Sequence, residues 1–288
     1  MRDKNKIFYL GGVKKVNHLN HYIINLVIEI TLFVVGLMLF KKWATANRKK
    51  HQEYDELIIK RAVSEVIPGA EFVRELCMEP SVLNGFGIIP YYDKYREKGM
   101  IRYKMGEKNY VFSNIHLLRA SSSQNGGKNY RTIYEGQAYT AHYKTSLPGR
   151  VRIITTKRFL NNEVNVGYPS KRKGETKIET ENIHFNDNFD VFATDEQSAF
   201  FVLNPVVMEQ LLEMKQRFEE VGVFVGGETM AITLKTNNFL FPEGNYNEQQ
   251  ALITLENTKD EVRGMLRMTE LLEDTINGSI ENNFTVRS

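Results

Sequence analysis

The chain has 288 residues, of which 42% are hydrophobic and 25% charged, and its formal net charge is +3. This composition is typical of a folded protein and excludes a disordered chain, and so small a net charge does not by itself indicate nucleic-acid binding. The single cysteine, Cys77, excludes both an intrachain disulfide and a tetrathiolate zinc site.

An apolar stretch at residues 22–40 is the first element along the chain. Of its 19 residues, 13 are Ile, Leu, Val or Phe. On the insertion scale these contribute about −4 to −8 kcal/mol, against a cost of about 2.5 to 3.5 kcal/mol for Glu29 near the middle. We therefore expect a single transmembrane helix at 22–40, with residues 1–21 as a basic tail and 41–68 as a juxtamembrane helix.

Polar and small residues share one side of this expected helix. Asn25 and Glu29 are four residues apart, and Gly36 continues the same stripe. The stripe predicts a helix–helix contact with a second copy or a partner protein, and the alternative is that Glu29 is merely tolerated in a marginal anchor. Basic residues are slightly more numerous after residue 40, so the positive-inside rule places the rest of the chain in the cytoplasm, with the lipid bilayer as a partner.

Residues 69–288 predict a soluble domain. Aromatic and β-branched residues alternate with turn signals up to about residue 174, and Arg150–Thr155 predicts a half-exposed strand. The Ser-, Gly- and Asn-rich residues 120–129 predict a surface loop. Because strands are grouped before and between helices, without regular alternation, we expect an α+β fold with a largely antiparallel sheet and packed helices.

The C-terminal third contains clear start and stop signals. Phe189–Phe192 predicts a strand, Thr194–Glu196 a turn, and Ser198–Leu203 an apolar returning strand. Asn204 and Pro205 then suit the N-cap and the first position of a helix.

Two further elements follow this helix. Val221–Val225 and Met230–Leu234 flank a Gly-Gly pair, which predicts a β-hairpin. Thr258–Glu261 matches a capping box, so we expect the last helix to begin there.

Motifs typical of enzymes are missing from the sequence. There is no nucleophile elbow, dinucleotide loop or kinase signature, and no two histidines of the soluble part have metal-ligand spacing, so we expect no metal and no cofactor. Four residues are candidates for acid–base chemistry: His142, His184, Asp187 and Asp190. They would suit an unrecognised membrane-bound hydrolase or transferase, whereas the simpler interpretation is that they solvate turns.

A basic stretch at residues 150–173 is the candidate binding region. Its members are Arg150, Arg152, Lys157, Arg158, Lys171, Arg172 and Lys173. On one rim they would attract anionic lipid headgroups or nucleic acid, although we expect no nucleic-acid partner. The alternative is an ordinary solvated face, because charged residues mostly lie outside.

The string FDVFATDEQSAFFVLNPVVMEQLLEM, residues 189–214, resembles the hallmark of a bacterial family of membrane-anchored proteins catalogued as domain of unknown function 3137. The hallmark combines an aromatic strand, an acidic turn followed by an alanine, and a Leu-x-Pro-x-x-Met-Glu helix start. The residues that carry it are Phe189, Val191, Asp195, Ala199, Leu203, Pro205, Met208 and Glu209. The resemblance extends from about residue 86 to the C-terminus. It implies a membrane anchor and a cytoplasm-facing α+β domain, and it implies no activity.

These observations lead to one hypothesis and two alternatives. The hypothesis is a non-enzymatic binding or adaptor domain, tethered as a single-pass protein at the cytoplasmic face of a bacterial cell membrane. The alternatives are the hydrolase or transferase, and an anionic lipid or nucleic-acid binder that uses residues 150–173.

Overall fold

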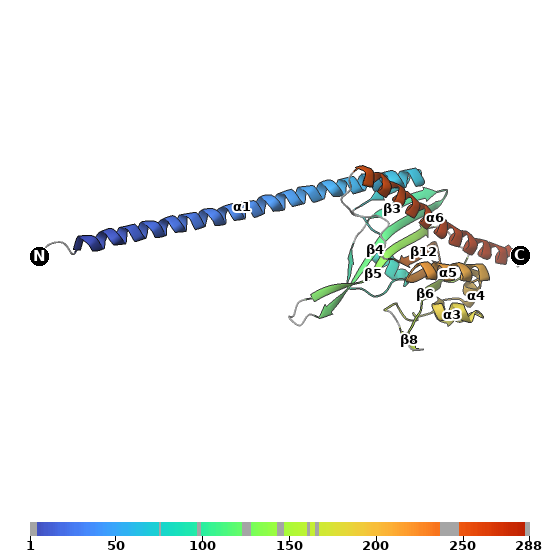
Figure 1. The fold of residues 1–288 in the computed structure, drawn as a ribbon. Helices are drawn as coiled ribbons and strands as arrows, with labels where there is room; N and C mark the ends of the chain where they lie inside the picture. The colour runs from blue at the N-terminus through green and yellow to red at the C-terminus, as the bar shows by residue number, and fades with distance from the viewer. Residues whose placement is uncertain are drawn as a thin grey trace. The chain divides into compact units, whose positions relative to one another are not determined.

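The structure is a computed structural model (Figure 1). Some helical residues, above all residues 5–28, are described by their backbone alone. The described residues are 5–74, 76–96, 99–122, 128–142, 147–159, 162–164, 167–236 and 248–285. The chain divides into two compact units, residues 1–54 and 55–288.

Helix α1 (Asn5–Val66) forms all of the described first unit, and it runs without a break through the three segments expected at 1–21, 22–40 and 41–68. The predicted transmembrane helix is wrong, because no helix among the described residues is both long and apolar enough for a membrane crossing. Glu29 and Lys41 bound an uncharged run of only eleven residues, 30–40, whereas a span needs about 20.

The polar stripe predicted on this helix is only partly described. Glu29 is exposed, and a Cβ added at Gly36 would meet nothing within 4 Å. The side chain of Asn25 lies outside the described residues. A helix–helix contact through these residues therefore stays a prediction.

The second unit is built on one ten-stranded sheet whose strand pairs are all antiparallel in the part of the chain that the structure describes. The strand order is β1-β3-β4-β5-β12-β11-β6-β10-β9, with β2 paired to β4. The strands are β1 (Glu71–Val73), β2 (Lys94–Arg96), β3 (Met100–Met105), β4 (Lys108–Ser122), β5 (Lys128–His142), β6 (Val151–Thr155), β9 (Thr176–Ile178), β10 (Phe189–Ala193), β11 (Glu220–Gly226) and β12 (Thr229–Lys235). A separate pair joins β7 (Lys157–Phe159) to β8 (Asn162–Val164).

Helices complete the unit, and together with the antiparallel sheet they confirm the α+β class. Besides the end of α1, they are α2 (Pro80–Phe86), α3 (Ile183–Asn188), α4 (Glu196–Val202), α5 (Pro205–Arg217) and α6 (Glu248–Thr285). Helices α5 and α6 lie side by side (Figure 1).

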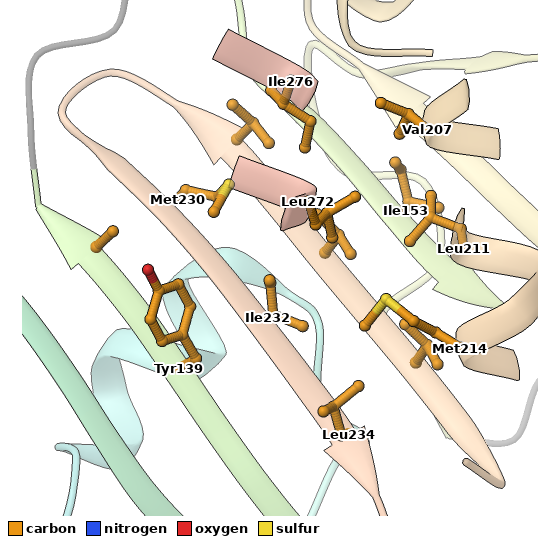
Figure 2. Packing of buried hydrophobic residues seen from close by; sticks show 14 of the residues in the cluster. Tyr139, Ile153, Val207, Leu211, Met214, Met230, Ile232, Leu234, Leu272 and Ile276 are labelled. Carbon is orange, nitrogen blue, oxygen red and sulfur yellow. The ribbon is translucent and has the colours of Figure 1, made fainter. Parts of the chain in front are cut away.

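The main core lies between these two helices and one face of the sheet (Figure 2). Leu211 and Met214 of α5 and Leu272 of α6 pack against strand residues such as Ile153 and Ile232. Successive strand side chains alternate between the two faces of a sheet, so the other face carries its own core. That second cluster contains Ile88, Ile154, Tyr168, Phe192, Phe224 and Ala231.

Strand β6 corrects the prediction of a half-exposed strand, because all five of its residues are buried. It lies between β11 and β10, with Val151 and Ile153 in the main core and Ile154 in the second cluster. Arg152 points to that second face, where the fold supplies it with polar partners.

Two predictions on helix ends have opposite outcomes. Asn204 caps α5 as predicted, because its side-chain oxygen accepts a hydrogen bond from the Val207 N–H at 2.8 Å. The strand predicted at Ser198–Leu203 is wrong, since these residues belong mostly to α4. Asp195 caps that helix by accepting from the Ser198 N–H at 2.8 Å.

The remaining local predictions concern the hairpin, the capping box and the loop at 120–129. The hairpin is confirmed, with β11 paired to β12. The capping box is wrong, because α6 begins at Glu248 and the Thr258 hydroxyl donates to the Thr254 carbonyl inside the helix. Of the loop predicted at 120–129, residues 120–122 belong to β4 and residues 128–129 to β5, and residues 123–127 lie outside the described residues.

Candidate functional site

The four acid–base candidates do not form one site. His142 lies at the end of β5, and β12, β11 and β6 separate that strand from Asp190 on β10. Four strand spacings amount to about 19 Å. Asp190 instead pairs with Lys177 at 2.8 Å. His184 and Asp187 are exposed on the six-residue helix α3. Among the described residues no cluster of His, Cys, Asp and Glu could hold a metal ion.

The basic candidates do not all lie on one exposed rim either. Arg150, Lys171 and Lys173 are exposed. Lys157 and Arg158 belong to β7, but their side chains lie outside the described residues. The remaining two, Arg152 and Arg172, point into the domain and contact other parts of the chain.

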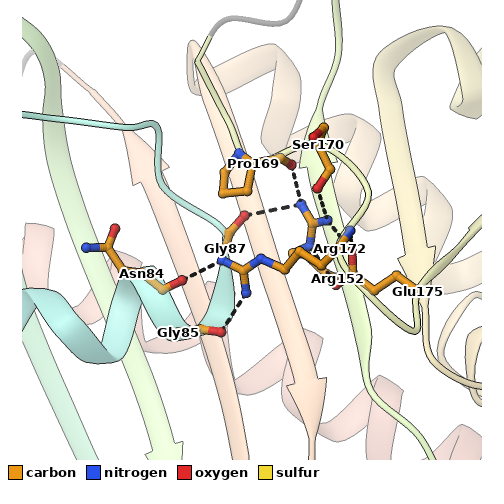
Figure 3. Close-up of polar contacts among 8 residues, drawn as sticks. All are labelled: Asn84, Gly85, Gly87, Arg152, Pro169, Ser170, Arg172 and Glu175. Carbon is orange, nitrogen blue, oxygen red and sulfur yellow. Dashed lines mark hydrogen bonds and ion pairs between the residues drawn. The ribbon is translucent and has the colours of Figure 1, made fainter.

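Arg152 is only 1% exposed, and its guanidinium donates hydrogen bonds to protein groups on every side (Figure 3). It meets both carboxylate oxygens of Glu175, at 3.2 and 2.5 Å, and the carbonyl of Pro169 at 2.9 Å. Its carbon Cζ also lies 4.3 Å from the centre of the Phe192 ring, a cation–π distance. Its donors are thus occupied within the fold, which makes Arg152 a structural residue and removes it from any external binding rim.

Arg172 completes this arrangement at the C-terminus of α2. It donates to the carbonyls of Asn84 and Gly85 at 2.6 and 2.7 Å, in the last turn of a helix where carbonyls lack their usual intrahelical partners, and the Asn84 carbonyl also accepts from the Gly87 N–H. Gly87 has φ 72°, and a Cβ there would lie 2.6 Å from Arg172 Cζ, so only glycine allows this approach.

Glu175 is held ionised by the two arginines. Burial alone would raise its pKa, but hydrogen bonds from the Arg152 side chain and the Arg172 backbone, together with both positive charges, hold that pKa below its ordinary value.

The structure places an open groove between α5 and α6, which we call the α5–α6 groove. Its volume is about 350 Å³, within the range of ligand pockets. Its lining residues are Gln210, Glu213, Met214 and Arg217 of α5, and Gly264, Arg267, Met268, Leu271 and Leu272 of α6. Met214 and Leu272 are buried at its base, whereas Leu271 is 57% exposed.

Gly264 helps to keep the groove open. A glycine inside a helix costs about 1 kcal/mol relative to alanine, so it needs a compensating reason. A Cβ added at Gly264 would meet nothing within 4 Å, which shows that no neighbouring group demands a glycine here. The missing side chain leaves space along the α6 wall.

Two kinds of polar group line the groove. Gln210 donates from Nε2 to the Thr275 hydroxyl at 3.2 Å, while its buried Oε1 has no hydrogen-bond partner within the described residues. Buried polar atoms usually have a partner, whereas among the described residues Oε1 is an unsatisfied acceptor behind the groove wall. Arg217 and Arg267 are exposed and make no ion pair in the part of the chain that the structure describes.

A buried carboxylate attaches α6 to the sheet behind the groove. Glu273 follows Leu272, is only 2% exposed, and accepts from Tyr139 at 2.9 Å and from Lys108 at 2.6 Å. Burial and the charges of nearby carboxylates, Glu273 first, raise the pKa of Tyr110 to about 12. This part of α6 is therefore fixed by polar contacts as well as by its core side chains.

The predicted site residues included none of the groove residues. Leu272 and Met265 lie on the apolar, buried stripe of α6. Two local signals point to the groove: Gly264 is a poor helix former within the helix, and Leu271 places an apolar side chain beside the stripe.

Comparison with known proteins gave two results besides a family match. No curated protein matches the chain significantly. The crystal structure of the mycobacterial trehalose monomycolate transport factor A, TtfA, is 9% identical with a TM-score of 0.35, and the alignment covers 72% of this chain and 94% of that one. A likeness at this level identifies neither the fold nor the function of this chain.

The family match covers every residue that lines the α5–α6 groove. It also contains the string at residues 189–214 on which the resemblance rested, although it begins later than residue 86. The matching description is "Protein of unknown function (DUF3137)", and the match extends over residues 132–275, half of the 288 residues. The chain therefore belongs to this family of proteins of unknown function.

Proposed function

We propose that the domain is a protein-binding module, and that the α5–α6 groove holds one helix of its partner. The observation that carries this proposal is a groove with an apolar base and an exposed leucine, Leu271, that no other part of the described chain covers. Helix-in-groove recognition uses such a surface, with apolar residues at i, i+4 and i+7 of the bound helix as anchors.

The length of the groove suits that spacing. Its lining extends from Gln210 to Arg217 on α5 and from Gly264 to Leu272 on α6. At 1.5 Å per residue these stretches are about 10 to 12 Å long, and positions i and i+7 of a helix are about 10.5 Å apart. Two turns of a partner helix therefore match the two walls.

Filling the groove should weaken binding without harming the fold. Gly264→Leu adds a side chain where a Cβ meets nothing, and leucine favours a helix over glycine by about 0.5 to 1 kcal/mol. We expect the full-length variant to unfold at the same or higher urea concentration than the unchanged chain. It should bind stapled helical peptides with a leucine stripe at i, i+4 and i+7 at least about tenfold more weakly in fluorescence anisotropy.

A matched pair of surface variants locates the site. Leu271→Asp changes a groove residue that is 57% exposed, and Leu252→Asp makes the same change on α6 outside the groove, at 58% exposure. Only the first should weaken binding, and only the groove methionines Met214 and Met268 should shift in methyl NMR spectra. Equal binding by the two variants, or no peptide binding above that of a scrambled non-helical control, would overturn the proposal.

A further inference from the structure

The charges on the two walls of the α5–α6 groove indicate which kind of partner helix would bind there. Arg217 lies on the α5 wall and Arg267 on the α6 wall, so each side of the groove carries one exposed guanidinium. Neither has an ion-pair partner within the described residues. Arginine presents several donors in a planar fork that matches a carboxylate, and it remains charged at all ordinary pH values.

Neither arginine makes an ion pair within its own helix among the described residues. Arg217 and Lys215 both lie in the last turn of α5, where basic side chains suit the helix dipole, and Lys215 donates to the Glu219 carbonyl just beyond the helix at 2.8 Å. On α6, Arg263 pairs with Asp260 at 2.8 Å, whereas Arg267 makes no ion pair within the described residues. Burial and the charges of Asp274 and Glu273 raise the pKa of Glu270, the carboxyl three residues after Arg267.

We infer that the partner is an acidic amphipathic helix, whose apolar stripe enters the groove while a carboxylate on each side of the stripe meets Arg217 and Arg267. This inference rests on the proposed helix-binding function. Glu213 on the α5 wall is the one acidic residue of the lining, and it disfavours a carboxylate at the partner position facing it. The preferred helix is therefore acidic beside its anchors but not acidic throughout.

Three stapled peptides test this inference against the full-length protein. They share one leucine stripe and carry Glu, Gln or Lys at the two flanking positions. Because rim ion pairs contribute little each, we expect the Glu peptide to bind about three- to tenfold more tightly than the Gln peptide, and the Lys peptide to bind most weakly. Salt at 0.5 M should reduce these differences to less than about twofold.

Reversing the charge of one arginine at a time tests whether the groove wall contacts the flanking residues of the peptide. Arg267→Glu should remove most of the preference for the Glu peptide over the Lys peptide, because Arg217 then attracts one flanking carboxylate while the new glutamate repels the other. Arg263→Glu, the same change on α6 outside the groove lining, should leave the preference unchanged. Equal affinities for the three peptides would overturn the acidic partner and leave the groove function intact. Failure of all three to bind would remove both. Self-association through Leu271 that excludes every peptide would show that a second copy fills the groove, and would also overturn the acidic partner.

Discussion

Replacing Arg152 by methionine should lower the free energy of unfolding by about 3–5 kcal/mol, the usual cost of removing one partner of a buried ion pair. The change leaves Glu175, of which 11% of the side chain is exposed, with a charge that the Arg152 guanidinium no longer balances. It also removes the donors to the Pro169 and Ser170 carbonyls. The measurement is urea unfolding of the full-length protein, followed by circular dichroism.

An exposed ion pair provides the control. Arg102 meets Glu71 at 2.8 Å, similar to the shorter contact of the buried pair, but the two side chains are 50% and 58% exposed. Arg102→Met should therefore cost less than about 1 kcal/mol. A double change of Arg152 and Glu175 to methionine should recover much of the loss, because no unpaired charge is then buried. If Arg152→Met costs no more than Arg102→Met, the structural role assigned to Arg152 is wrong.

The same pair makes stability depend on pH in a defined direction. The folded-state pKa of Glu175 lies below the ordinary value of 4.5, because hydrogen bonds and charges from Arg152 and Arg172 outweigh the effect of burial. Its contribution is therefore complete above about pH 4.5 and is lost as the pH falls through the lower folded-state pKa. Urea midpoints measured at pH 7, 5, 4 and 3 should fall less steeply for Glu175→Gln than for the unchanged chain.

Local signals in the sequence correctly predicted the elements that are determined by residues a few positions apart in the chain. The β11–β12 hairpin turns at Gly227, whose φ is 62°, and Asn204 needs only the N–H of Val207 to cap α5. The α+β class followed from the grouping of strands and helices. Where two local signals compete, the prediction failed: the apolar residues of α4 suit a strand, but the cap at Asp195 selects a helix.

The burial of Arg152 and the α5–α6 groove depend on tertiary contacts, which the sequence pattern does not show. Arg152 alternates with apolar residues, which is typical of a half-exposed strand, but Glu175 pairs with it from 23 residues away and allows its burial. The α5–α6 groove depends on the spacing of two helices that are separated by the β11–β12 hairpin. Gly264 and Leu271 were visible as irregularities, but only the packed helices show that they line one opening.

Replacing Glu273 by leucine should cost about 2–3 kcal/mol, mainly because the buried Tyr139 hydroxyl loses its acceptor. Burial, the largest cause that raises the pKa of Tyr139, is still present in this variant, so the hydroxyl stays neutral and its donor is left without an acceptor. Lys108 is 35% exposed and can turn to water, so its share of the loss is smaller. Asp260→Leu, which breaks an exposed ion pair on the same helix, is the control and should cost less than about 1 kcal/mol.

A double-mutant cycle separates the hydrogen bond from other effects of the leucine. Adding Tyr139→Phe to Glu273→Leu removes the stranded hydroxyl, so the double variant should be more stable than the sum of the single losses predicts, by about 1 kcal/mol or more. Glu273→Gln keeps an acceptor for Tyr139 and should lose least. Because Leu272 lines the groove beside Glu273, Glu273→Leu should also weaken binding of the leucine-stripe peptide, while Asp260→Leu should not. Purely additive losses in the cycle would show that Tyr139 and Glu273 do not act together to hold α6 against the sheet.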